Sequence, residues 1–161
     1  QAMSLGGGHE GGLRSGTENV MGAVAMAAAA KHRAESLRSE PRRYLNRRAR
    51  LLAALRAVAP DCVVVGPQDE ADCLGSILSV AFPKAVAETL LHMLEAEGIA
   101  CGSGSACSSH GHTESTILNA IALPQELRNS VLRFSLDGSE TDEQIASVSV
   151  ALAASLKRLG C

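Results

Sequence analysis

A run of small residues at positions 98–112 constrains this chain more than any other stretch of its sequence. Most of these residues are Gly, Ala, Ser or Cys, and three glycines lie inside the run. Side chains of this size cannot fill a hydrophobic core, and glycine allows backbone angles that are closed to other residues. We therefore expect a surface loop held between regular elements, a kind of segment that often carries binding and catalytic residues.

Cys107 lies in the middle of this loop, and a cysteine thiolate is a strong nucleophile. Cys101 ends the apolar part of the run and is expected to be a small core residue, since cysteine is among the most buried residue types. A metal site is a further alternative, because His110 and His112 could bind zinc together with the two cysteines. Their spacing departs from the paired ligands of structural zinc sites, which makes this alternative the less favoured one.

Composition narrows the class of protein. The chain has 161 residues, enough for one domain, and its 2% of aromatic residues without Trp requires an aliphatic core. A net charge of −2 argues against a general nucleic-acid binder. Five cysteines without a repeated spacing are typical of reduced thiols, and no apolar run reaches membrane-spanning length, so we expect a cytoplasmic protein.

Hydrophobic periodicity predicts an α+β fold, with a mixed sheet covered by helices. Thr141 followed by Gln144 forms a capping box, which indicates the start of the last helix. The expected helices cover residues 20–38, 41–60, 86–97, 113–121 and 141–159. The expected strands cover residues 62–65, 76–82, 99–101 and 131–136.

The first glycine-rich stretch, residues 6–19, precedes the expected Ala-rich helix. Glycine-rich turns that run into a helix can bind phosphate, and Arg14, Ser15 and Thr17 add a cation and two hydroxyl groups. The spacing matches neither the dinucleotide-binding nor the P-loop motif, so a flexible lead-in is an equal alternative.

Five arginines in the second expected helix could form a binding patch. Only one aromatic residue, Tyr44, lies among them, too few for a series of stacked bases, which favours a solvated face instead. These residues are Arg42, Arg43, Arg47, Arg48 and Arg50.

Together these motifs resemble the cysteine desulfurases, in the branch with a long active-site loop that supplies iron–sulfur cluster assembly. The matching segments are GGGHE at residues 6–10, RSGTEN at 14–19, SGSACSS at 103–109 and LRFSL at 132–136, followed by Thr141. The match runs over essentially the whole chain in the right order.

This resemblance implies the small C-terminal domain of an aminotransferase-like (fold type I) pyridoxal-phosphate enzyme, normally a homodimer. Residues 1–19 would be a glycine-rich remnant of the cofactor domain, and residues 20–161 the small domain with its long connecting helix. The enzyme would convert L-cysteine to L-alanine and pass the sulfur, as a persulfide, to an acceptor such as an iron–sulfur scaffold protein.

The resemblance also implies three residue roles. Cys107 matches the nucleophile that takes the sulfur, and Arg133 matches the arginine that holds the substrate carboxylate. Thr17 matches a residue that reaches the pyridoxal phosphate of the partner subunit.

The chain departs from the family pattern in several places. The family's Schiff-base lysine follows a histidine well before the glycine-rich motif, and Lys31, Lys84 and Lys157 stand in no such context. We therefore expect the isolated chain to be inactive. Val86 replaces a capping Asp, and residues 110–112 are unusually rich in histidine. A sulfur carrier that uses Cys107 only as an acceptor, and a metal-binding regulator, are the alternative functions.

Overall fold

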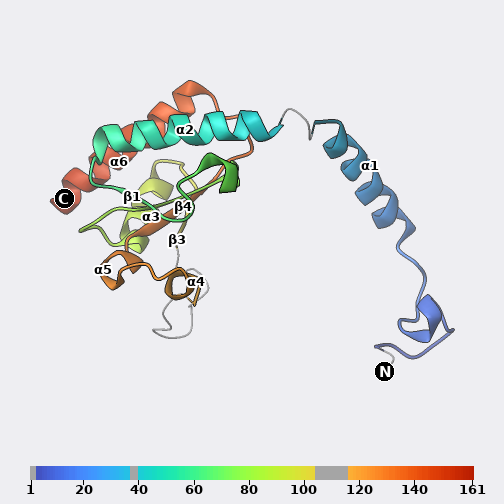
Figure 1. Ribbon diagram of the computed structural model, residues 1–161. Helices are drawn as coiled ribbons and strands as arrows, with labels where there is room; N and C mark the ends of the chain where they lie inside the picture. Colours follow the sequence, from blue (N-terminus) through green and yellow to red (C-terminus); the bar gives the residue numbers. More distant parts are fainter. Residues whose placement is uncertain (1–2, 37–39, 104–115) are drawn as a thin grey trace. The chain divides into compact units, whose positions relative to one another are not determined.

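The computed structural model describes residues 3–36, 40–103 and 116–161 (Figure 1). The chain divides into two compact units, residues 1–38 and residues 39–161. The boundary that the family resemblance implies, after residue 19, stays a prediction. No helix in the described ranges is long and apolar enough to cross a membrane.

The first unit consists of a glycine-rich turn followed by one helix. Residues Ser4 and Arg14 form a parallel bridge around the short 3-10 helix η1 (Glu10–Gly12), and α1 (Val20–Ser36) follows. The Asn19 side chain accepts the Gly22 N–H at 3.0 Å, as an N-cap residue does. The helix expected at residues 20–38 is confirmed as far as Ser36. None of the described residues of this unit is buried.

The second unit is built on a four-stranded sheet. Its order is β1 (Val63–Val64), β2 (Ile77–Ala81), β4 (Val131–Ser135) and β3 (Gly102–Ser103). The α+β class is confirmed, but each described pairing is antiparallel, whereas we expected a mixed sheet. Both β2 and β3 run antiparallel to β4 and hence parallel to each other. No parallel ladder forms between them because β4 lies in between.

Three helices cover one face of this sheet and enclose the main core. They are α2 (Glu40–Val58), α3 (Ala87–Ala96) and α6 (Asp142–Leu159), and α2 and α6 lie side by side (Figure 1). The sheet contributes alternate buried side chains, and each helix contributes a buried leucine stripe. The fully buried members include Leu55, Leu78, Val80, Leu90, Leu94, Leu132 and Leu152.

The opposite face of the sheet is covered only in part. The short helices α4 (Thr116–Ala120) and α5 (Gln125–Arg128) flank a small cluster of Ala81, Leu118, Leu123 and Val131. Towards the other end of the same face, Arg133 and Ser135 are exposed and Ser79 is half-buried. This open half of the face is the only part of the described sheet where polar side chains point away from the core.

Local sequence signals account for most of the element ends. The capping box is confirmed: the Gln144 N–H donates to the Thr141 hydroxyl at 3.2 Å, and the Thr141 N–H donates to the Gln144 side chain at 2.8 Å. Val86 is the N-cap of α3 and makes no side-chain capping bond, as expected for a residue that replaces an Asp.

The prediction of a strand at residues 99–101 is wrong. The Ile99 N–H still bonds to the Leu94 carbonyl at 2.9 Å, because the chain is leaving α3 there, and Ile99 and Cys101 pack against the core. Strand pairing begins only at Gly102, where the chain reaches β4. The helix expected at residues 113–121 is described from Thr116 onward, and α5 was not predicted.

Candidate functional site

Arg133 lies in the centre of β4, on the open half of the sheet. Its cross-strand partners are Ser79 in β2 and Gly102 in β3. Because Leu132 and Phe134 point into the core, the alternation of a strand directs Arg133 to the opposite face. The sequence therefore places a cation on the open half of the sheet, between the small residues Ser79 and Gly102.

The guanidinium of Arg133 lies close to Gly102. A Cβ atom at Gly102 would lie 3.4 Å from Nη2 and 3.7 Å from Nε of Arg133, so the guanidinium lies over β3. Within the described ranges, no hydrogen bond or ion pair engages this side chain. Its planar set of N–H donors is thus available to bind a carboxylate with two parallel hydrogen bonds.

The loop that carries the proposed nucleophile begins directly beside Arg133. Gly102 pairs with Arg133, and Ser103 is the last residue described before the segment 104–115. Cys107, His110 and His112 lie outside the described residues. The nucleophile assignment and the metal alternative therefore both stay predictions.

Cys101 behaves as a residue of the core edge. It is half-buried and packs against the main core, and burial raises the pKa of its thiol, with a further contribution from the Glu95 carboxylate. A raised thiol pKa lowers the fraction of thiolate at neutral pH. Burial likewise raises the pKa of the Cys62 thiol, although the neighbouring Arg56 opposes this shift. Both cysteines are thus poorly suited to be nucleophiles.

Thr17 lies in the first unit, whereas Arg133 belongs to the second. Thr17 is exposed, and the Arg14 guanidinium donates to its backbone carbonyl at 3.4 Å. Gly16 has a φ of 119°, and a Cβ atom there would lie 2.9 Å from Nη1 of Arg14. A glycine in this backbone conformation thus lets the cation lie close to the Thr17 backbone. A guanidinium that lies close to an exposed threonine fits the chemistry of a phosphate group.

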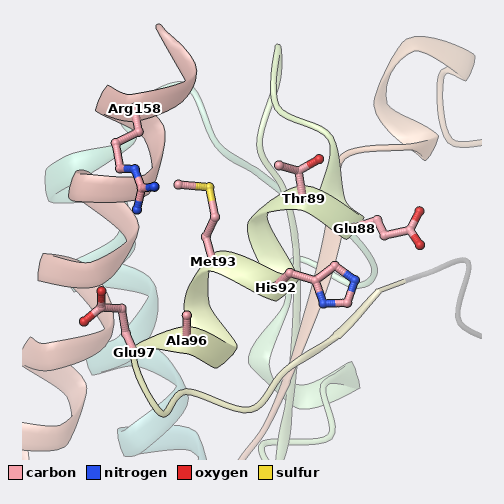
Figure 2. A pocket seen from close by; sticks show the side chains of 7 residues that line it. All are labelled: Glu88, Thr89, His92, Met93, Ala96, Glu97 and Arg158. Carbon is pink, nitrogen blue, oxygen red and sulfur yellow. The ribbon is translucent and has the colours of Figure 1, made fainter.

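A depression on the outer face of α3 contains none of the predicted site residues (Figure 2). The side chains of Met93 and Arg158 point toward each other across it, while Glu88 points away. Its lining includes His92, which forms an exposed ion-pair contact of 3.4 Å with Glu95 when protonated. In the described ranges, no group of three His, Cys, Asp or Glu side chains could hold a metal ion.

Comparisons with known proteins agree on the family. The family model for aminotransferase class V matches residues 8–148. The cysteine desulfurase IscS of Clostridium botulinum is 35% identical over 145 residues, covering 90% of this chain and 36% of that protein. The cysteine desulfurase NifS of Azotobacter vinelandii is 34% identical over 145 residues, covering 89% of this chain and 36% of its own length.

A solved structure titled NifS-like protein has the same fold. It superposes on 98% of this chain and 39% of its own length with a TM-score of 0.81 and 26% sequence identity. The chain thus spans somewhat more than a third of the length of the proteins that it matches.

Proposed function

The chain belongs to the aminotransferase class-V family, and we propose that it forms the sulfur-accepting and substrate-binding part of a pyridoxal-phosphate-dependent cysteine desulfurase. The observation that carries this proposal is the unengaged guanidinium of Arg133, which lies beside the strand that leads to Cys107. The names of the similar proteins support the choice of reaction.

Arg133 would bind the carboxylate of L-cysteine. Two parallel N–H···O bonds to a carboxylate fix both its position and its orientation, which a single ammonium group does not. The small neighbours Ser79 and Gly102 support this role, because they leave the guanidinium accessible above the sheet.

Cys107 would accept the sulfur atom. Its thiolate Sγ attacks the sulfur of the substrate, an S–S bond forms, and the Cβ–S bond of the substrate breaks to leave L-alanine after proton uptake. Cys107 follows Ser103 by four residues, a distance that an extended chain spans with at most about 14 Å. Ser103 pairs with Leu132, the residue next to Arg133 in β4. The thiol and the carboxylate-binding group would therefore be close enough to serve one small substrate.

Thr17, with Arg14 next to it, would bind the phosphate of the cofactor. When bound, pyridoxal phosphate supplies the electron sink that makes the substrate sulfur open to attack. None of the three lysines of the chain stands in the sequence context of a Schiff-base lysine. The covalent anchor of the cofactor is therefore proposed to come from a preceding segment of the polypeptide.

The wider setting of the enzyme is also part of the proposal. We infer a cytoplasmic homodimer that acts on L-cysteine and passes the persulfide sulfur to an acceptor such as an iron–sulfur scaffold protein. The basis is the resemblance of the loop and glycine motifs to those of the long-loop desulfurases. The five cysteines also show no repeated spacing, which is typical of reduced thiols.

The decisive experiment joins this chain to the N-terminal part of the Clostridium botulinum relative. Cys107→Ser should abolish sulfide release and leave the cofactor absorbance unchanged, because anchoring and sulfur attack lie on different segments. Arg133→Ala should raise KM for L-cysteine by about tenfold to a hundredfold, the usual loss for a charge-assisted pair. Arg158→Ala, on an unrelated surface, is the control and should change neither value. Sulfide release by the Cys107→Ser variant would refute the assignment.

A second measurement uses the 161-residue chain alone and requires no cofactor. Treated with a low-molecular-weight persulfide and analysed by peptide mass spectrometry, the chain should gain sulfur at Cys107 well before Cys101. A preference for Cys101 would overturn the nucleophile assignment. Turnover of L-cysteine by the isolated chain with added pyridoxal phosphate would instead contradict the proposed division between segments.

A further inference from the structure

The first half of α2 carries four arginines around one shallow depression. Asn46 of the same helix and Asp142, the first residue of α6, complete the lining. The arginines are Arg42, Arg43, Arg47 and Arg50, and we refer to the six residues as the arginine surface. All of them belong to the second compact unit, so their arrangement is defined.

The arginine surface already binds one carboxylate. A single oxygen of Asp142, Oδ1, accepts a hydrogen bond from Arg47 at 2.8 Å and another from Arg50. These contacts lower the pKa of the Asp142 carboxyl and raise the pKa of the Arg50 guanidinium. They tie the start of α6 to α2, and they show that the side chains of this surface can converge on a carboxylate.

Positive charge remains in excess at the arginine surface. Within the described ranges, Arg42 makes no hydrogen bond or ion pair. The acid nearest to Arg43 is Glu40, at 3.7 Å, and the side chains of Arg43 and Arg50 stay 51% and 52% exposed. Each guanidinium has five N–H donors, so two carboxylates leave most of them without a protein acceptor.

We propose that the arginine surface docks an acidic segment of a protein partner, whose carboxylates bind Arg42 and Arg43 next to Asp142. Arginine is enriched in protein interfaces, where its planar donors bind carboxylates with two hydrogen bonds. With four cations and one carboxylate in its lining, the depression keeps a net positive charge, which raises the local concentration of a negatively charged ligand.

The surroundings favour a protein segment over a nucleic acid. Two further acids lie near the arginine surface: hydrogen bonds from Ser139 and, to a smaller extent, the charge of Arg43 lower the pKa of the Asp137 carboxyl, and Glu143 follows Asp142 in the sequence. An extended phosphate backbone would be repelled by these acids, whereas a short acidic segment need not extend as far as them. The chain as a whole is also negative, with a net charge of −2.

The test titrates the isotope-labelled 161-residue chain with a capped hexaglutamate peptide at low salt and follows the backbone amide signals by NMR. We expect saturable shifts at residues 42–50 and weaker binding as salt is added. Arg42→Glu should reduce the affinity about tenfold or more, because it places a like charge at the contact, and Arg42→Gln should reduce it less.

Arg158→Glu is the matched control, because it makes the same change of net charge on the last turn of α6. It should leave the affinity within about twofold of the parent. Far-UV circular dichroism checks that each variant is folded. The proposal is overturned if the peptide does not bind saturably, or if both charge reversals weaken binding equally. It is also overturned if a single-stranded oligonucleotide or inorganic phosphate binds the same residues more tightly than the peptide. The test involves neither cofactor nor cysteine, so its outcome is independent of the desulfurase proposal.

Discussion

Replacing Gly75 by Ala should destabilise the second unit. Gly75 lies just before β2 and directly against α2, and a Cβ atom there would lie 2.8 Å from the Leu45 backbone nitrogen and 2.9 Å from the Tyr44 Cβ atom. These are atoms of a helix backbone and of a side-chain stem, so they can move only if α2 moves. The backbone of Gly75 is not in the left-handed region, and packing alone decides the result.

Two opposing effects determine the magnitude. Exchange of glycine for alanine in a compatible conformation stabilises a protein by about 0.4–1 kcal/mol through the unfolded state. Overpacking against rigid neighbours costs about 1–3 kcal/mol. We therefore expect a net loss of about 1–2 kcal/mol, which moves the urea midpoint down by about 0.5–1 M at an m-value of about 2 kcal/mol/M.

Urea unfolding followed by far-UV circular dichroism is the suitable assay, since the chain has no Trp for fluorescence. Gly102→Ala is the control, because its new Cβ would make an ordinary contact of 3.4 Å with the movable Arg133 side chain. It should stay within about 0.5 kcal/mol of the parent. A Gly75→Ala variant as stable as the parent, with an unchanged m-value, would refute the packing argument.

Three further predictions concern the second unit. Thr141→Ala removes the hydroxyl cap of α6 and should cost about 1 kcal/mol in the same urea titration, so an unchanged midpoint would contradict the capping role. The hydrogen bond and charge of Arg50 lower the pKa of the Asp142 carboxyl. The ionised Asp142 therefore stabilises the fold at pH values above its unfolded-state pKa, and this stabilisation is lost as the pH falls through its folded-state pKa. Asp142→Asn should therefore flatten the acid limb of a stability–pH profile, and a profile identical to the parent's would exclude this linkage. Cys101 is half-buried and its thiol pKa is raised, so it should react with a bulky maleimide more slowly than the exposed Cys161. Peptide mass spectrometry measures the two rates, and equal rates would contradict the burial of Cys101.

The element types of this protein follow from short-range patterns in its sequence. The leucine spacing of α3, the alternation of residues 131–136 and the Thr141 capping box depend on residues within about one helical turn or one strand. Local geometry alone links such patterns to structure, and the structure confirms them. The small-residue composition of positions 98–112 likewise predicts a functional loop, and this stays a prediction because residues 104–115 lie outside the described ranges.

Only the tertiary structure decided how distant segments meet. It inserts β4 between β2 and β3, sets Arg133 over Gly102, and joins Arg47 and Arg50 to Asp142 across more than ninety residues of sequence. It also presses Gly75 against α2, where an ordinary helix–strand connection would tolerate alanine. These contacts depend on which faces pack together and in which strand order. Local propensity is the same for every arrangement of the same elements, so only the packing of the whole core distinguishes among them.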